Sequence, residues 1–252
     1  MNGRTYARPK RPTVVICLDG FDPEYLDHGV ANGKLPTLAA LRRDGFVGHA
    51  LATLPTTTNT NNTSIVTGVS PAVHGVNGNF YLDAETGEEI MITDARRLRC
   101  GTILGALSSI GVPTAVVTAK DKLLKALAYE MDGIAFSSEY ADKADLSKFG
   151  FANGEALVGR PRPDQYSADL SLFALDAGLK LLQSPTRPDL MYLSTSDYVQ
   201  HKNAPGEPDS DAFHVAVDQR VAAMMAMGAT VARRPNEARS MDSICSPPAC
   251  RR

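Results

Sequence analysis

The chain has 252 residues, of which 43% are hydrophobic and 21% are charged, and its formal net charge is -2. This composition is typical of an ordinary globular domain and leaves enough apolar residues to form a core. The small negative charge offers no basic surface to nucleic acid or anionic lipid. We therefore expect a small-molecule partner and no nucleic-acid partner.

The start of the chain is basic and short of apolar residues. Residues 1–12 read MNGRTYARPKRP, and we expect this segment to be flexible. The apolar run that follows, Thr13 to Leu18, is too short for a signal-peptide core or a membrane span. We therefore predict a cytoplasmic protein without a membrane partner.

Short apolar runs rich in β-branched residues alternate with helical patterns along the chain. The runs predict buried strands at Thr13–Leu18, Thr114–Ala119, Gly133–Ser138 and Leu190–Thr195. Apolar residues at helical spacing predict helices at Pro36–Arg43, Thr102–Ile110, Ser167–Gln183 and Ala212–Met227. This alternation predicts an α/β fold with a mostly parallel sheet and helices on both faces.

The stretch Pro55 to Gly68, PTTTNTNNTSIVTG, places hydroxyl and amide side chains at the start of a short helix. The N-terminus of a helix carries unpaired N–H groups and partial positive charge, which attract a phosphate or another oxyanion. Thr58 is therefore a candidate for phosphoryl-type chemistry. The alternative is that this segment is only a helix N-cap in a polar loop.

Polar residues directly follow three of the predicted strands. Asp19 follows the first, Lys120 follows the second and Asp197 follows the strand at Leu190–Thr195. Ligands of parallel sheets bind outside the carboxyl ends of the strands, so we expect these side chains to converge at one edge. The alternative for each residue is a loop or capping role.

Asp197 and His201 form a D-x-x-x-H pair, and one helical turn would place carboxylate and imidazole on the same side. The two groups can form part of a zinc site, or they can be a surface pair without metal. Asp19 is a further candidate ligand, because Gly20 allows a tight turn beside it. Lys120 and Lys122 can hold an anionic substrate, or they can begin a solvated helix.

The end of the chain has a different character. Residues 229–232, ATVA, resemble the start of a strand, but residues 233–252 show neither helical nor strand periodicity and contain few apolar residues. We expect 233–252 to be a disordered tail. The predicted domain covers 13–232, with a sheet that is incomplete at the C-terminus.

Five segments together resemble the phosphonoacetate hydrolase family of the alkaline phosphatase superfamily, close to its nucleotide pyrophosphatase/phosphodiesterase branch. They are LDGFDPEYL from Leu18, PTTTNTNNTSIVTG from Pro55, VHGVNGNFY from Val73, TAKDKL from Thr118 and STSDYVQHKNAPGE from Ser194. The resemblance covers about Thr13 to Ala232 and stops there. It implies an alkaline-phosphatase-like sheet, apparently truncated after Ala232 by comparison with the family.

The resemblance also implies an activity: a two-zinc hydrolase that cleaves the carbon–phosphorus bond of phosphonoacetate to acetate and phosphate, in phosphonate catabolism. It makes Thr58 the nucleophile, with Asp19 and Thr58 on one zinc and Asp197 and His201 on the other. It makes Asn79, Lys120 and Lys122 substrate-binding residues. An Asp-His pair and a later histidine that the family uses to complete the metal sites have no counterpart here.

Three functional hypotheses remain open from the sequence. The chain can be an active phosphonoacetate-type hydrolase, a non-catalytic remnant with incomplete zinc sites, or a phosphodiesterase of the same superfamily. The lysine pair argues against the third, because a phosphodiester lacks the carboxylate that the lysines would bind. A homodimer is also left open.

Overall fold

The computed structural model describes residues 1–236 and 241–245. In chain order, the strands are β1 Thr13–Asp19, β2 Phe46–Ala50, β3 Phe80–Leu82, β4 Glu89–Met91, β5 Thr114–Thr118, β6 Ile134–Ser137, β7 Leu190–Ser194, β8 Thr230–Asn236 and β9 Met241–Cys245. The α-helices are α1 Pro23–Ala31, α2 Pro36–Asp44, α3 Thr58–Thr67, α4 Pro71–His74, α5 Ile103–Ser108, α6 Leu124–Leu127, α7 Gly154–Val158, α8 Asp169–Gln183 and α9 Pro208–Ala226. Short 3-10 helices lie at Asp121–Leu123, Ser138–Lys143 and Ser147–Phe149.

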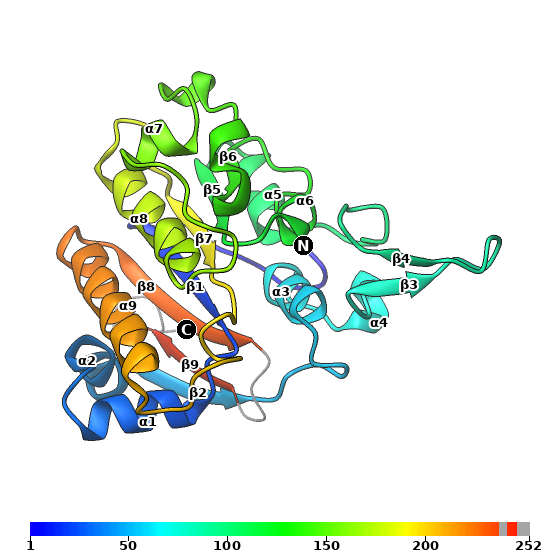
Figure 1. The fold of residues 1–252 in the computed structure, drawn as a ribbon. Helices are drawn as coiled ribbons and strands as arrows, with labels where there is room; N and C mark the ends of the chain where they lie inside the picture. Colours follow the sequence, from blue (N-terminus) through cyan, green and yellow to red (C-terminus); the bar gives the residue numbers. More distant parts are fainter. Residues whose placement is uncertain (237–240, 246–252) are drawn as a thin grey trace.

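The main sheet contains seven strands within the described residues, in the order β2-β9-β8-β1-β7-β5-β6. The segment from β8 to β6 is parallel throughout, whereas β9 pairs antiparallel with both β8 and β2. Helices cover both faces, with α8 and α9 on one side and α3, α5 and α6 on the other (Figure 1). The predicted α/β fold with a mostly parallel sheet is confirmed.

Side chains of the central strands alternate between the two faces of the sheet. In β1, Val14 and Ile16 belong to the core under α8 and α9, whereas Cys17 belongs to the core under α3 and α5. In β7, Leu193 faces the first core and Tyr192 the second. Because both faces are buried, a shift of one residue would exchange the two sets of side chains, and the register is fixed.

The predicted helices are present with shifted ends. α9 begins at Pro208, four residues before the predicted start, because Pro208 occupies the first turn, where a proline costs no hydrogen bond. Asp218 of α9 also caps α2: its two carboxylate oxygens accept hydrogen bonds from the backbone N–H groups of Thr37 and Leu38 at 3.1 and 2.7 Å. This buried carboxylate joins α2 to α9.

The described structure differs from the expectation of a disordered tail over 233–252. Strand β8 runs on to Asn236 alongside β1, and Met241–Cys245 forms β9. Pairing with β1 and β2 gives these backbone groups hydrogen-bond partners, so a segment with few apolar residues can still join a sheet. Residues 237–240 and 246–252 lie outside the described residues.

A two-stranded hairpin of β3 and β4 projects away from the main sheet (Figure 1). Its base is held by Asn59 of α3. The backbone N–H of Asn59 donates to Oδ1 of Asn79, just before β3, and its Nδ2 donates to the carbonyl of Ile92, just after β4, at 3.2 and 2.9 Å. Both ends of the hairpin are therefore attached to the first turn of α3.

None of the described helices is both long and apolar enough to cross a membrane.

Replacing Leu193 with alanine tests the two-faced packing of the sheet. Leu193 is fully buried at the centre of β7, so L193A is expected to lower the free energy of unfolding by about 2–5 kcal/mol. L82A, on the exposed hairpin, is the matched control and is expected to change it by no more than about 0.5 kcal/mol. Urea unfolding measures both, and equal losses would contradict the packing described.

Candidate active site

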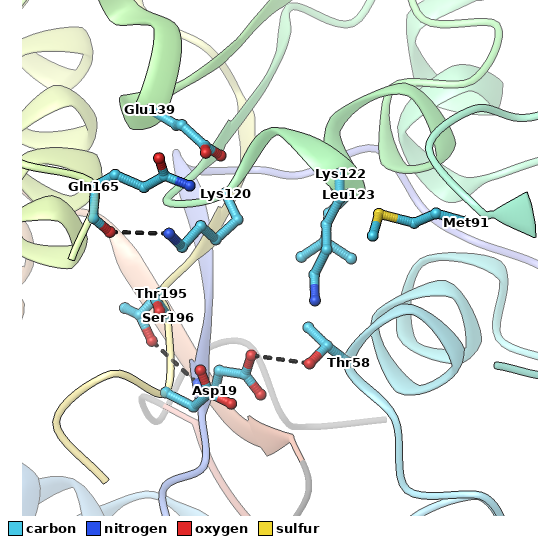
Figure 2. Close-up of a pocket in the computed structure, with 11 residues that line it drawn as sticks. Asp19, Thr58, Met91, Lys120, Lys122, Leu123, Glu139, Gln165, Thr195 and Ser196 are labelled. Atoms are coloured by element: carbon cyan, nitrogen blue, oxygen red, sulfur yellow. Dashed lines mark hydrogen bonds between the residues drawn. The ribbon is translucent and has the colours of Figure 1, made fainter. Parts of the chain in front are cut away.

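A polar pocket of about 280 Å³ lies at the carboxyl ends of the parallel strands. The structure brings together there three strand-end residues that the sequence singled out, Asp19, Lys120 and Asp197 (Figure 2). Thr58 and Lys122 line the same pocket. Acidic and basic side chains therefore line the same pocket.

Thr58 is the first residue of α3, and its side chain is turned into the pocket. The N-cap position belongs to Thr57, whose backbone is extended, and the Thr58 hydroxyl instead donates a hydrogen bond to Oδ2 of Asp19 at 3.3 Å. The N-cap of this segment is therefore Thr57 and not Thr58. The helix is fixed to the sheet by Asn62, whose Oδ1 accepts a hydrogen bond from the Tyr192 hydroxyl at 2.8 Å.

Asp19 ends β1 and is almost completely buried, with 3% of its surface exposed. Its backbone N–H donates to the hydroxyl of Thr195, just beyond β7, at 3.1 Å. Gly20 then turns the chain with a φ of +68°, and a Cβ at this position would lie 3.1 Å from the Cβ atoms of Asp197 and Gln200. A glycine is needed here for both its backbone conformation and its size.

Asp197 and His201 are joined by a hydrogen bond of 2.8 Å between Oδ2 and Nε2. One helical turn connects them, as the spacing predicts, since the backbone N–H of His201 donates to the Asp197 carbonyl. Asp197 lines the pocket, but His201 lies in an adjoining depression with Gly20 and Gln200, and its side chain is 73% exposed. The imidazole is therefore at the rim.

The lysine pair lies opposite the carboxylates (Figure 2). Lys120 donates from Nζ to the carbonyl oxygen of Gln165 at 2.9 Å, and its ammonium lies 4.8 Å from the centre of the Tyr166 ring. Burial lowers the pKa of Lys120, and the neighbouring Lys122 adds to this, whereas Glu139 opposes it.

Asn79 does not line the pocket; its Oδ1 accepts a hydrogen bond from the backbone N–H of Asn59, next to Thr58.

Sequence reasoning missed several residues that line the pocket. Glu139 directly follows β6, so the strand-end argument that found Asp19 could also have found it. Its carboxylate accepts a hydrogen bond from the backbone N–H of Asp121 at 2.9 Å. Met91 and Gln165 come from a hairpin and a loop, and no pattern in the sequence indicates them.

The donor atoms fit a zinc ion in kind but not in number. Carboxylate oxygens, a hydroxyl and an imidazole nitrogen are all zinc ligands, and they form two pairs, Asp19 with Thr58 and Asp197 with His201. A catalytic zinc normally takes three protein ligands. Across residues 1–236 and 241–245, no three His, Cys, Asp or Glu side chains are placed to hold one metal ion.

His74, near α3, forms a hydrogen bond with Ser64 but is not arranged as a general base. The backbone N–H of Val76 donates to Nδ1 at 3.1 Å, so the proton lies on Nε2, which donates to the Ser64 hydroxyl at 2.8 Å. Burial lowers the pKa of His74 to about 4. The histidine is therefore neutral and structural, as its isolation in the sequence indicates.

Comparison with known proteins gives the family. A model described as type I phosphodiesterase / nucleotide pyrophosphatase matches residues 13–228. The chain belongs to this family. A shorter match, 35% identical over 79 residues, is to an uncharacterized pyrophosphatase/phosphodiesterase of Schizosaccharomyces pombe and covers 31% of this chain and 16% of that protein.

Solved structures similar to this chain include two of a phosphonoacetate hydrolase and one of an alkaline phosphatase. Crystal structures of phosphonoacetate hydrolase from Sinorhizobium meliloti, in complex with phosphonoacetate and with phosphonoformate, each show 44% identity and a TM-score of 0.88. Each match covers 93% of this chain and 58% of the hydrolase, so the chain spans less than two thirds of that protein's length. The alkaline phosphatase PafA, at 16% identity and a TM-score of 0.65 over 92% of this chain and 63% of that one, shares the fold.

Replacing Gly20 with alanine tests the close approach at the end of β1. Gly33 has nearly the same φ, +67°, but open space around it. The free energy of unfolding lost in G33A is therefore that of the strained backbone conformation alone, about 1–2 kcal/mol. G20A is expected to cost at least about 1 kcal/mol more, because the neighbouring Cβ atoms must shift. Urea unfolding measures the difference, and equal losses in the two variants would show that the contact is unimportant.

His74 predicts a loss of stability in acid. The unfolded chain takes up the proton near pH 6.5, whereas the folded chain takes it up only near pH 4, so the stabilisation is complete above pH 6.5 and falls between these values. The expected loss is up to about 3 kcal/mol. Urea unfolding between pH 7.5 and pH 4 should show the free energy of unfolding falling with pH in the wild type and falling less in H74Q. Equal falls in the two proteins would refute the role of His74.

Proposed function

We propose that the chain is a phosphonoacetate hydrolase, a metal-dependent enzyme that converts phosphonoacetate and water to acetate and phosphate. The supporting observation is the arrangement of the pocket: the hydroxyl of Thr58 lies beside a buried carboxylate and faces two lysines. The carboxylate of phosphonoacetate would lie against the lysines, and its phosphonate would lie beside Thr58, where bound metal ions would have to offset the negative charge of Asp19 and Asp197. The solved hydrolases at 44% identity, in complex with phosphonoacetate and phosphonoformate, support the same choice.

Thr58 is the proposed nucleophile. Its hydroxyl loses a proton as the oxygen bonds to phosphorus. The carbon–phosphorus bond breaks, and the bonding electrons leave with the methylene carbon, which takes up one proton to give acetate and so balances the proton lost by the hydroxyl. Water then attacks the phosphorus of the threonine ester and releases phosphate, and a proton from that water restores the hydroxyl. Asp19 orients the Thr58 hydroxyl, and the partial positive charge at the start of α3 favours the phosphonate oxygens.

Lys120 and Lys122 are proposed to bind the substrate carboxylate. When the carbon–phosphorus bond breaks, negative charge on the methylene carbon spreads onto the carboxylate oxygens. Two ammonium groups at that position would stabilise this charge more than the charge of the ground state. The lysines would therefore contribute to the rate as well as to the choice of substrate.

The proposed cofactor is zinc, held by Asp19 and Thr58 at one position and by Asp197 and His201 at the other. A bound zinc ion would lower the pKa of the threonine hydroxyl and offset charge on the phosphonate oxygens. The described residues provide two donors to each position. Weak zinc binding by this chain, as in a non-catalytic remnant, is therefore the outcome that would most directly count against catalysis.

Hydrolysis of a phosphodiester is the second candidate, and the description of the matching family favours it. The two functions make opposite predictions for the lysines. A diester carries no carboxylate, so K122A should leave its hydrolysis unchanged while raising the KM for phosphonoacetate.

Thr58 provides the direct test of the proposed chemistry. With saturating zinc, T58A is expected to lose about a thousandfold or more in phosphate release from phosphonoacetate, because no other described hydroxyl occupies its place. T57A removes the neighbouring threonine side chain and should keep most of the activity. Removal of zinc by a chelator should abolish turnover in all three proteins.

Two results would overturn the proposal. One is a wild-type chain that binds zinc tightly yet releases no phosphate from phosphonoacetate. The other is equal activity in T58A and the wild type.

A further inference from the structure

The ammonium group of Lys120 is held by uncharged groups. Its Nζ donates to the backbone carbonyl of Gln165 at 2.9 Å and lies 4.8 Å from the centre of the Tyr166 ring. Among the ion pairs in the described part of the chain, none involves Lys120. An incoming carboxylate therefore meets a cation that is already oriented and does not have to displace an acidic side chain.

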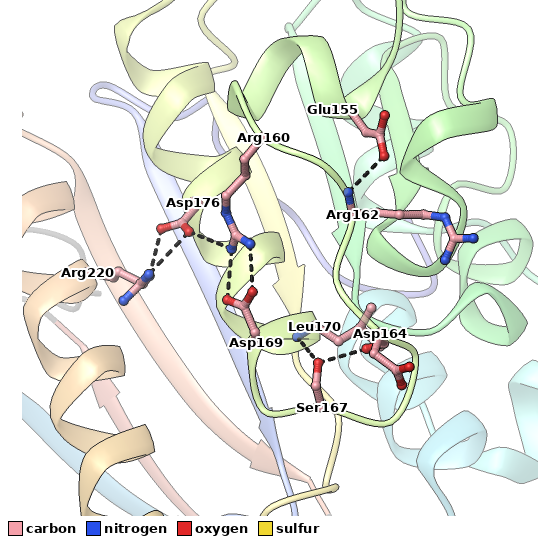
Figure 3. Close-up of polar contacts among 9 residues, drawn as sticks. All are labelled: Glu155, Arg160, Arg162, Asp164, Ser167, Asp169, Leu170, Asp176 and Arg220. Atoms are coloured by element: carbon pink, nitrogen blue, oxygen red, sulfur yellow. Dashed lines mark hydrogen bonds and ion pairs between the residues drawn. The ribbon is translucent and has the colours of Figure 1, made fainter.

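Gln165 and Tyr166 belong to the segment 159–168, between α7 and α8, which is fixed at its start by Arg160. The guanidinium of Arg160 forms two hydrogen bonds with Asp169, at 2.7 and 2.9 Å, and a third with Asp176 at 3.1 Å (Figure 3). Arg220 of α9 joins the same cluster through Asp176 at 2.7 Å. The bidentate geometry fixes the direction of Arg160 as well as its position.

The rest of the segment has its own hydrogen bonds (Figure 3). The backbone N–H of Arg162 donates to the Glu155 carboxylate at 2.8 Å. Asp164 accepts from the backbone N–H of Tyr166 at 2.7 Å, and its carbonyl accepts from the Ser167 hydroxyl at 2.7 Å. The turn that presents Gln165 and Tyr166 to Lys120 is therefore stabilised independently of the lysine.

Tyr166 makes little contribution to a core. It is 69% exposed, so its ring covers Lys120 from the solvent side, and its removal leaves no cavity. A lysine side chain has four rotatable bonds, and binding a ligand restricts all of them. Restricting them before the ligand arrives increases affinity, and an aromatic ring does so without neutralising the charge.

We propose that Tyr166 is a positioning residue: with the carbonyl of Gln165, it holds the Lys120 ammonium in the orientation that selects a carboxylated substrate. The inference rests on the proposed function, in which Lys120 binds the carboxylate. It adds the segment 159–168 as the part of the chain that determines substrate choice.

The first measurement is steady-state kinetics of Y166L, Y166F and the wild type with phosphonoacetate and with a nitrophenyl phosphodiester, which lacks a carboxylate. Y166L is expected to raise the KM for phosphonoacetate about threefold to tenfold with a smaller fall in kcat, and to leave the KM for the diester unchanged. Y166F keeps the ring and should behave as the wild type.

Tyr140 provides a matched control. It is 42% exposed and lies 4.8 Å from the ammonium of Lys143, the same distance as in the Lys120–Tyr166 pair, but neither residue lines the pocket. Y140L therefore removes an equivalent contact and should leave both KM values unchanged.

The second measurement does not need turnover. Competitive acetylation, read by mass spectrometry, compares the reactivity of Lys120 with that of Lys122 and Lys125 in the same sample. Because Y166L removes the contact between the Lys120 ammonium and the Tyr166 ring, acetylation of Lys120 should increase about twofold or more in this variant. Acetylation of Lys120 should not increase in Y140L. If no substrate is hydrolysed, the proposed function fails and this labelling alone decides the positioning role.

The inference is overturned by either of two results. The first is an active Y166L enzyme whose KM for phosphonoacetate equals that of the wild type. The second is an inactive chain in which Lys120 is acetylated equally in Y166L and the wild type.

Discussion

All strands of a parallel sheet point their carboxyl ends to the same edge, and the candidate site depends on this constraint. β1, β5 and β7 place Asp19, Lys120 and Asp197 around one pocket although long stretches of sequence separate them. The two buried faces prevent the strands from slipping, so the loops begin at fixed points. The hydrogen bond from the Asp19 backbone to Thr195 then joins the ends of two adjacent strands.

The second feature of the site is the separation of charge across the pocket. Lys120 and Lys122 lie across the pocket from Asp19, and the carboxylate of Glu139 lies near Lys120. Burial of Asp19 costs free energy, which the hydrogen bond from Thr58 partly offsets. The same hydrogen bond sets the direction of the hydroxyl, so that one contact stabilises the carboxylate and orients the proposed nucleophile.

The strands and the convergence of their ends could be predicted from sequence, because a short unbroken apolar run flanked by turn residues is typical of a buried strand. Asp19, Lys120 and Asp197 followed from that prediction, whereas Thr58 was found from the helix start that contains it. The hairpin and the loop at Gln165 could not be predicted, because their positions depend on contacts between distant segments, such as that of Arg160 with Asp176. The start of β8 was anticipated at residues 229–232, but its continuation to Asn236 and the pairing of β9 were missed, because these residues include few apolar ones.

Asn59 gives the projecting hairpin a mechanical connection to the pocket. Asn59 follows the proposed nucleophile in the chain and forms hydrogen bonds with Asn79, just before β3, and Ile92, just after β4. Phe80, at the base of the hairpin, and Leu82, farther along β3, are largely exposed to solvent. A movement of the hairpin would therefore be transmitted through these two hydrogen bonds to the first turn of α3, where Thr58 precedes Asn59.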